Sequence, residues 1–372
     1  MARRISETGI LNDWPVARPV TEAELSGTFW SFGLFGHQPH AAFMVLAPNG
    51  RVGNYRNTNE EGWLVLRGQL ALMSHKGLPT TIFDRALTTD GEIITLLGHV
   101  RSPGPSLIHI LQRVAHPAHP LHATPTDASR DVQFLKRPSL PARPNLVVLR
   151  AGDTSLHRKW AKDIADEDRC WDLCISSYCS DPAAMLDEAD YLTHQPHQRK
   201  FQAIHDLFFK DSPLWQYDRV WLPDDDLMTK WSDINLMFHL ARENDLDLSQ
   251  PSLLPLEGCF IAHDITRQQP DSVVRYGEGV EIMCPIFSSR ALRICRGTFR
   301  DSVSGFGLDH IWPSLLGGGP SRTAVIDAVG VIHTRPFGQN YDIRSALVEE
   351  AALLNAYQFE AEAPPLFSAV TP

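Results

Sequence analysis

Short runs of alternating hydrophobic and polar residues occupy residues 27 to 100. This alternation is typical of strands with one buried face, because successive side chains along a strand point to opposite sides of the sheet. Residues that favour hairpin turns separate the runs, at Pro48-Asn49-Gly50, His75-Lys76-Gly77 and Asp90-Gly91. The pattern predicts a small all-β domain over residues 27 to 102, preceded by an N-terminal segment of residues 1 to 26.

Proline and short polar residues dominate residues 103 to 144. Proline interrupts both helix interiors and central strands, so we interpret this stretch as a linker with one short helix near residues 106 to 114. His116, His119 and His122 repeat at every third position, a spacing that suggests a metal site. The prolines between them do not favour a helix that would bring the three side chains to one face, and a solvated linker is the preferred interpretation.

The hydrophobic pattern changes after residue 144. NLVVLRA, residues 145 to 151, is a continuous aliphatic run of the kind that is buried in a parallel sheet. Further strands are predicted at residues 171 to 179 and 218 to 223, and helices at residues 156 to 166, 199 to 209 and 232 to 244. This alternation of strands and helices predicts an α/β domain with a mixed sheet and flanking helices over residues 145 to 340.

Two predicted helices have a hydrophobic stripe of helical period. The first has Ser232 as its expected N-cap, and its stripe consists of Ile234, Met237, Phe238 and Ala241. The second lies in the C-terminal segment, residues 341 to 372, and its stripe consists of Ile343, Leu347, Ala351 and Leu354. We expect the second stripe to pack on the α/β domain, with a homodimer contact or a peripheral membrane contact as alternatives.

Composition and charge narrow the classes of function. Hydrophobic residues make up 43% of the chain and charged residues 21%, as is usual for folded globular proteins. The 44 acidic residues outnumber the 34 basic ones, so nucleic acid is not an expected partner. No apolar run approaches the roughly 18 residues of a membrane span, and no signal-like stretch follows the first arginines, so we expect a cytoplasmic protein with six reduced, mostly buried cysteines.

Three consecutive carboxylates, Asp224, Asp225 and Asp226, follow the strand predicted at residues 218 to 223. Ligands of open α/β sheets bind beyond the carboxyl ends of the strands. If extended geometry continues, Asp224 and Asp226 point to the same side of the chain. A cation relieves the repulsion between two converging carboxylates, and Mg2+ or Mn2+ prefers oxygen ligands and commonly binds substrate phosphates. The pattern predicts a divalent metal site, with capping of the next helix as the structural alternative.

This part of the sequence resembles known glycosyltransferases. A hydrophobic strand that ends in D-x-D is similar to the nucleotide-sugar site of the GT-A fold, which is Rossmann-like. Five segments in order resemble the domain-of-unknown-function family numbered 707, which is regarded as glycosyltransferase-like: VWLPDDDL, DLDLSQPSL, VEIMCPIFSSRAL, GFGLDHIW and AVIDAVGVIHTRP. The likeness covers residues 145 to 337 and says nothing about residues 1 to 140.

The resemblance implies a role for each matching metal-site residue. Asp226 corresponds to the aspartate that holds the metal, and Asp224 to the one that contacts the ribose or the metal. Asp225 is the substitute if the register slips by one residue. His333, after the last strand, corresponds to a histidine that completes the metal or diphosphate site, although a buried structural histidine is the alternative.

The resemblance also implies a nucleoside site and a base. Arg150, Gly152 and Asp153 follow the first strand of the α/β domain and would approach the nucleobase and ribose. Asp309 corresponds to the base of inverting members. A sugar hydroxyl is a poor nucleophile near neutral pH, so a carboxylate that removes its proton assists attack. Asp309 is alternatively an N-cap, with Gly305 and Gly307 as a helix-entry turn. Two further features are interpreted as structural, namely His263 and the glycines 317 to 319.

The leading hypothesis is a hexosyltransferase that uses Mn2+ or Mg2+ to transfer a sugar from a nucleotide sugar, a UDP-sugar in the first instance. The acceptor would be a hydroxyl of a bacterial glycan or polysaccharide. One alternative is a carbohydrate-binding or scaffold protein in which Trp63 of the β domain contacts glycan, although a core position is favoured for this residue. A second alternative is a metal-dependent phosphoesterase, which uses similar aspartates.

Overall fold

The protein is described by a computed structural model over residues 11, 14–101, 107–114, 132–139, 141, 143–160, 164–277, 279–317, 322–336, 342–357 and 368–370. Its fold is mixed α/β. The chain divides into two compact units. The first contains residues 1–117 with residues 314–318 and 357–359, and the second contains the remainder. The three linker histidines, His116, His119 and His122, lie outside the described residues.

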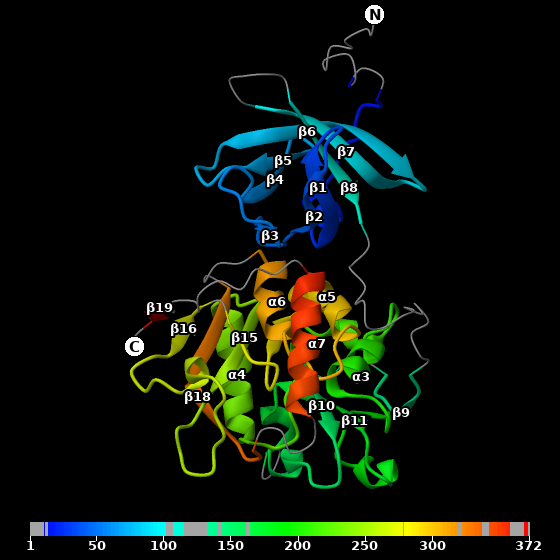
Figure 1. Ribbon diagram of the computed structural model, residues 1–372. Helices are drawn as coiled ribbons and strands as arrows, with labels where there is room; N and C mark the ends of the chain where they lie inside the picture. The colour runs from blue at the N-terminus through cyan, green and yellow to red at the C-terminus, as the bar shows by residue number, and fades with distance from the viewer. Residues whose placement is uncertain are drawn as a thin grey trace, which may run out of the picture. The chain divides into compact units, whose positions relative to one another are not determined.

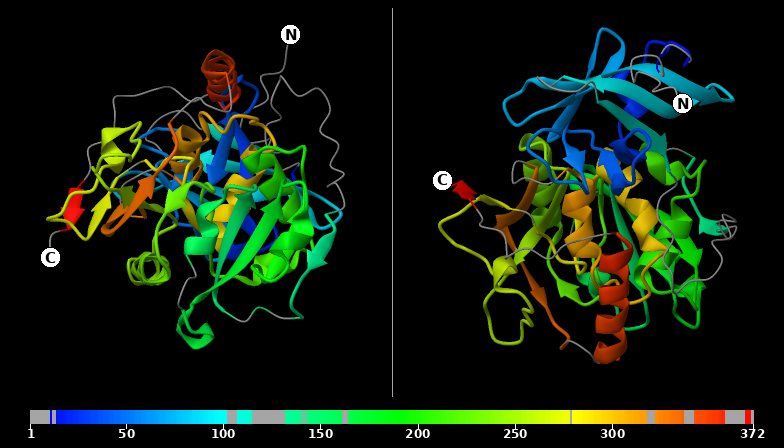
Figure 2. Two further views of the ribbon diagram at one scale, coloured as in Figure 1. Left: turned by 90° about the horizontal axis from the view of Figure 1, so that it is seen from below. Right: turned by 45° about the horizontal axis from the view of Figure 1, so that its top comes forward.

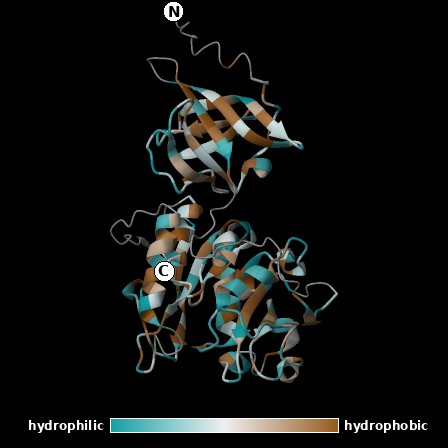
Figure 3. Ribbon diagram, turned by 45° about the vertical axis from the view of Figure 1, so that its right-hand side comes forward, coloured by the Kyte–Doolittle hydropathy of each residue, from teal (hydrophilic) through white to brown (hydrophobic). Residues whose placement is uncertain are grey.

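The first unit is built on an eight-stranded antiparallel sheet, in the order β3-β2-β1-β8-β7-β6-β5-β4 (Figure 1). Its elements are α2 (Glu22–Leu25), β1 (Thr28–Leu34), β2 (Pro39–Leu46), β3 (Val52–Gly53), β4 (Gly62–Leu66), β5 (Gln69–Met73), β6 (Pro79–Thr89), β7 (Glu92–Val100) and β8 (Ile108–Arg113). Hydrophobic and polar residues share the strands (Figure 3), and side chains such as Trp30 and Phe83 fill the core. The predicted turn Asp90-Gly91 joins β6 to β7, with both residues at the positive φ that a tight hairpin requires.

Two sequence expectations for this unit meet different outcomes. The helix predicted near residues 106 to 114 is wrong, because residues 108 to 113 form strand β8. β8 pairs with both β1 and β7, so tertiary hydrogen bonding overrides the local pattern and extends the sheet beyond residue 102. Trp63 is a core residue, since it is 5% exposed and its Nε1 donates to the carbonyl of Ala47 at 2.8 Å. Its ring is therefore not available to contact a glycan.

The second unit is built on an eleven-stranded mixed sheet, in the order β19-β16-β18-β15-β17-β13-β10-β11-β12-β9, with β14 paired to β18. The strands are β9 (Phe134–Lys136), β10 (Asn145–Ala151), β11 (Trp171–Ser177), β12 (Tyr191–His194), β13 (Arg219–Trp221), β14 (Leu227–Met228), β15 (Leu248–Leu253), β16 (Val274–Tyr276), β17 (Ile286–Ser288), β18 (Thr323–His333) and β19 (Ser368–Val370). The strands predicted at residues 145, 171 and 218 are confirmed as β10, β11 and β13.

Helices flank this sheet. They are α3 (Lys200–Leu207), α4 (Trp231–Glu243), α5 (Ser289–Phe299), α6 (Leu308–Leu315) and α7 (Ile343–Ala356). α4 packs against β15 and β18, whereas α5 lies on the other side of the sheet, against β13 and β17 (Figure 2). The short 3-10 helices are η2 (Leu156–Lys159), η3 (Asp166–Asp168), η4 (Pro182–Met185), η5 (Pro213–Gln216) and η6 (Asp264–Thr266). No helix among the described residues has both the length and the hydropathy needed to cross a membrane.

Three helix expectations need correction. In the helix predicted at residues 156 to 166, the described residues 156–160 and 164–166 contain only the 3-10 turn η2 and the start of η3, so no α-helix forms over these described residues. The buried stripe of α4 is confirmed, but its N-cap is Lys230, so Ser232 lies inside the first turn. In α7 the predicted packing face is largely solvent-exposed, and Ala346 and Leu353 are buried instead. The helical period of the α7 sequence predicted an apolar stripe, but the helix packs on the protein with a different face.

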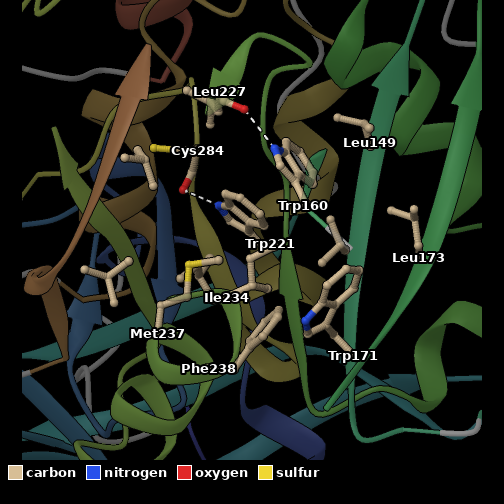
Figure 4. Packing of buried hydrophobic residues seen from close by; sticks show 14 of the residues in the cluster. Leu149, Trp160, Trp171, Leu173, Trp221, Leu227, Ile234, Met237, Phe238 and Cys284 are labelled. Carbon is tan, nitrogen blue, oxygen red and sulfur yellow. Dashed lines mark hydrogen bonds between the residues drawn. The ribbon is translucent and has the colours of Figure 1, made fainter. Parts of the chain in front are cut away.

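A tryptophan pair links the core of the second unit to the loops at the sheet edge (Figure 4). The rings of Trp160 and Trp221 lie 5.3 Å apart between their centroids. Trp160 Nε1 donates to the carbonyl of Leu227 at 2.8 Å, and Trp221 Nε1 donates to the carbonyl of Cys284 at 3.1 Å. These fully buried indoles therefore hold the segment after the Asp triplet and the segment before β17, both of which contribute to the site described below.

Candidate functional site

Six strands of the eleven-stranded sheet run in one direction. β10, β11, β12 and β13 are mutually parallel, and β15 and β18 are parallel to each other. β17 is antiparallel to both β13 and β15, so the two groups point the same way. The segments that follow these strands meet at one edge of the sheet, and the segment that precedes β17 meets them there. This edge brings residues 152–155, 178, 224–226, 281–285 and 333–335 together.

Asp225 is the hub of a hydrogen-bond network at this edge. Its carboxylate accepts from Gly152 N at 3.1 Å, from the Tyr178 hydroxyl at 2.9 Å and from Arg335 Nη1 at 2.8 Å. Arg335 also donates to the carbonyl and the hydroxyl of Thr154. With three donors bound, Asp225 holds the segments of Gly152, Tyr178 and Arg335 together.

Gly152 is required by a close approach of backbone and ring. A Cβ atom at this position would lie 2.5 Å from a ring carbon of Tyr178, well inside van der Waals contact. The residue was predicted at the nucleoside site, and the structure places it against Tyr178 beside the Asp225 hub. Only a residue without a side chain lets the ring and this loop lie so close together.

We expect Gly152→Ala to displace Tyr178 and to break its hydrogen bond to Asp225. Because the loop after β10 would move with it, the free energy of unfolding should fall by about 1 kcal/mol, the effect of roughly one lost hydrogen bond. Urea unfolding measures this loss. The double variant Gly152→Ala/Tyr178→Ala gives the methyl group room and should lose less stability than the two single changes added together. A strictly additive double variant would show that the contact does not matter.

Arg150 and Asp153, the other predicted nucleoside residues, lie in different environments. Arg150 is buried, and its guanidinium donates to the side chain of Ser176 and to the carbonyls of Gln195 and Gln198. Burial lowers the pKa of Arg150 to about 10, and the nearby Tyr178 and Asp225 oppose this shift. Arg150 therefore ties strand ends together below the edge, whereas Asp153 is exposed on the loop above it.

Asp226 and His333 face each other at the centre of the edge. Asp226 Oδ2 lies 3.3 Å from His333 Nε2. His333 Nδ1 is 3.0 Å from the carbonyl of Phe260, which can only accept, so Nδ1 carries a proton. Burial lowers the pKa of His333, but the Asp226 carboxylate outweighs burial and leaves that pKa raised. The second oxygen of Asp226 is buried without a hydrogen-bond partner.

One carboxylate and one imidazole in this pair could hold a divalent metal ion. When Nδ1 holds the ring proton, Nε2 and the carboxylate are both acceptors, so a proton or a cation must lie between them. Asp226 Oδ2 and His333 Nε2 lie close enough together that both could hold one Mg2+ or Mn2+ ion, which would offset the charge of the carboxylate. A carbonyl that fixes the other ring nitrogen is the usual support of a metal-binding histidine. Among the described residues no three His, Cys, Asp or Glu side chains converge into a larger metal cluster.

Asp224 is paired with a lysine that the sequence analysis did not identify. Lys200 Nζ donates to Asp224 Oδ1 at 2.7 Å and to the carbonyls of Ile282 and Met283 at 2.7 and 3.0 Å. Its three donors are thus satisfied by three fixed acceptors. Asp224 is neutralised by this ammonium group, while 39% of its side chain remains exposed toward solvent. Lys200 is the first residue of a helix, and nothing in the local pattern distinguishes it from a surface lysine.

Asp309 lies in the first turn of α6. Gly305 and Gly307, with φ of 92° and 84°, make the turn that brings the chain to this helix. Burial raises the pKa of Asp309, Glu350 adds to the shift, and His310 and His263 oppose it. Asp309 in turn helps to raise the pKa of Glu281, so these two carboxylates are electrostatic neighbours.

Glu281 is a second residue that the sequence analysis did not single out. It is only 6% exposed, and neither carboxylate oxygen has a hydrogen-bond partner. Burial raises its pKa to about 8, Asp309 and Asp224 add to the shift, and His333 opposes it. The residue belongs to the segment VEIMC, in which a single glutamate gives no signal of this environment.

We expect Glu281 to make stability depend on pH. Its pKa is 4.5 when unperturbed and about 8 in the folded protein, so between these values the native state holds a proton that the unfolded chain releases. Stability is therefore lost as pH rises from about 4.5 to 8. Compared with Glu281→Gln in urea unfolding without metal, the wild type should lose on the order of 3 kcal/mol between pH 5 and 8. A constant difference between the two proteins would contradict this assignment.

No protein-family model matches this chain, and no curated protein matches its sequence. The solved structures that it resembles include three distant ones. S. aureus TarS 1-349 in complex with UDP-GlcNAc has 10% identity and a TM-score of 0.37, over 58% of this chain and 71% of that one. A mycobacterial protein has 14% identity and a TM-score of 0.35, over 62% and 84% of the two chains. A psychrophilic marine protease MP inhibitor has 16% identity and a TM-score of 0.21, over 26% and 100%. These scores are too low to support an argument about fold or function.

Proposed function

We propose that this protein is a metal-dependent glycosyltransferase that transfers a sugar from a UDP-sugar to a hydroxyl of a glycan. The observation that carries the proposal is the pair Asp226 and His333, whose side chains face each other at the carboxyl ends of parallel strands. A nucleotide site is expected at this edge of an open α/β sheet. Two protein ligands leave most coordination positions for the phosphates of a substrate, as is usual for Mg2+ and Mn2+.

The residues around the pair have separate tasks in this proposal. Asp226 and His333 would hold Mn2+ or Mg2+, which when bound offsets the charge that develops on the diphosphate leaving group. Asp225 keeps the loops after β10 and β11 in place through Gly152 and Tyr178. Lys200 prevents Asp224 from repelling the other carboxylates, and the exposed part of Asp224 is available to a ribose hydroxyl.

Asp309 is the proposed base. As the acceptor hydroxyl attacks the anomeric carbon, its O–H bond breaks and the proton passes to the Asp309 carboxylate. The bond between the sugar and the diphosphate breaks, and its electron pair leaves with the nucleoside diphosphate. A carboxylate whose pKa is raised accepts a proton more readily than an ordinary one, which suits a general base.

Calorimetric titration of UDP in the presence of Mn2+ tests the proposal. The wild type should bind UDP with Mn2+ and much more weakly when a chelator removes the metal. Absence of UDP binding in excess Mn2+ would refute the proposal. Release of inorganic phosphate from simple phosphoesters, without sugar transfer, would favour a phosphoesterase instead.

A further inference from the structure

Glu281 belongs to the segment that contacts the Asp triplet, since Lys200 bridges Asp224 and the carbonyls of Ile282 and Met283. His263 Nε2 lies 3.9 Å from Glu281 Oε1, and Asp309, His333 and Asp224 are its electrostatic neighbours. The backbone supports this placement, because Asp224 N donates to the carbonyl of Met283 at 2.8 Å. The transferred sugar must occupy the same region, because it is bonded first to the diphosphate and then to the oxygen that the base deprotonates.

The carboxylate of Glu281 has unused hydrogen-bonding capacity in a fixed position. Glu281 is only 6% exposed, and neither of its carboxyl oxygens has a hydrogen-bond partner. The imidazole Nε2 of His263, at 3.9 Å from Glu281 Oε1, is beyond hydrogen-bond range. The main chain is held in place, because the N–H of Glu281 donates to the buried side chain of Gln250.

A buried, unpartnered carboxyl group is destabilising by itself. Groups of this kind are retained where a ligand supplies the missing partners. A carboxyl group has two oxygens that accept hydrogen bonds and, when protonated, also donates one, which matches two neighbouring hydroxyl groups of a hexose because each hydroxyl both donates and accepts. A hydrophobic or cationic side chain at the same position would offer no such match.

We propose that Glu281 binds hydroxyl groups of the transferred sugar and thereby determines which donor sugar is accepted. This inference rests on the proposed glycosyltransferase function. Once the sugar is bound, its hydroxyls satisfy both oxygens of Glu281. A sugar that lacks one of these hydroxyls leaves a buried oxygen unpaired, so the site discriminates strongly against it.

The test compares binding of UDP with binding of UDP-sugars. UDP, UDP-glucose, UDP-galactose and UDP-N-acetylglucosamine are titrated with Mn2+ into the wild type, Glu281→Gln and Glu281→Ala. Both variants should bind UDP within about twofold of the wild type and should lose about tenfold or more of the added affinity for the preferred UDP-sugar. Glu257→Gln, a change at an exposed acid on the same unit, should behave as the wild type.

Deoxy donors separate sugar binding from the alternative that Glu281 is itself a proton acceptor. The wild type should discriminate against the donor that lacks the contacted hydroxyl by about 100-fold or more in kcat/KM, and Glu281→Ala should discriminate by less than about tenfold. Loss of turnover with unchanged discrimination would identify a base and overturn the inference.

Other outcomes also decide the matter. If both variants lose affinity for UDP and for UDP-sugars equally, Glu281 has a structural role and the inference is overturned. If neither variant changes the affinity for UDP-sugars, the inference is overturned as well. In both cases UDP binding by the wild type leaves the proposed function standing. If the wild type binds no UDP, the proposed function fails and the inference fails with it. Urea unfolding of each variant establishes that it is folded.

Discussion

Asp226→Ala should abolish metal-dependent nucleotide binding. The change removes the carboxylate that lies 3.3 Å from His333. The remaining ligand, His333 alone, should bind Mn2+ weakly, because this ion prefers oxygen ligands. We expect the affinity for UDP in Mn2+ to fall by roughly 100-fold or more. Loss of a residue that only hydrogen-bonds to a metal ligand already lowers metal affinity by about 10- to 100-fold, and loss of a ligand itself should cost at least as much. Calorimetric titration of UDP with and without Mn2+ measures the loss, and sugar transfer should fall in parallel.

The controls for this change follow from the surroundings of Asp226. His333→Ala should reproduce the loss, because it removes the other acceptor. Asp271→Ala removes a carboxylate from an exposed site and should leave binding unchanged. Asp226→Asn keeps the shape of the side chain and its hydrogen-bonding reach, but it removes the charge, so intermediate affinity is expected. Undiminished Mn2+-dependent binding by Asp226→Ala would exclude this residue as a ligand.

Asp309→Asn should separate binding from chemistry. The amide keeps the size of the side chain but cannot accept the acceptor's proton, and general-base catalysis typically contributes about 100- to 10,000-fold to the rate. We expect sugar transfer to fall within this range while the affinity for UDP and Mn2+ stays within about twofold, because Asp309 and the Asp226–His333 pair are contributed by different elements. Single-turnover transfer assays and calorimetry on the same preparation measure the two effects.

The pH dependence provides a second readout for Asp309. Because burial raises the pKa of this carboxylate, its protonated, inactive form persists to higher pH than for an ordinary aspartate. Transfer by the wild type should therefore increase as pH rises through that raised pKa. In Asp309→Asn this increase should disappear. Full turnover in the variant, or an unchanged pH profile, would remove Asp309 from the mechanism.

The core of the second unit was predictable where the hydrophobic pattern is long and regular. The aliphatic run at residues 145 to 151 became β10, and the stripe that begins at Ile234 became the buried face of α4. The exceptions were short or marginal segments. Residues 108 to 113 form a strand because β1 and β7 offer hydrogen bonds on both sides. In α7, the hydrophobic stripe that was predicted to be buried lies on the exposed face of the helix. Neighbours that are distant in the chain decided both outcomes.

In the candidate site, too, local sequence context identified some features, whereas residues distant in the chain decided others. The Asp triplet after a strand, the late histidine and Asp309 were all identifiable, because each has a recognisable local context in the sequence. Their individual roles were not. The sequence separated Asp225 from Asp224 and Asp226 only by the side of the chain that it faces. It did not show that Asp225 accepts from three donors on distant loops, or that Asp224 is paired with Lys200.

The sequence by itself determined the long regular elements, such as β10 and α4, and the place after β13 at which carboxylates gather, because hydrophobic period and turn chemistry act between near neighbours in the chain. Only the tertiary structure decided which carboxylate faces His333, which is neutralised and which, Glu281, is buried without a partner. The physical reason is that charge pairing and burial depend on distances in space. Gly152 and Asp225, for example, are separated by 73 positions in the chain and by 3.1 Å in the fold.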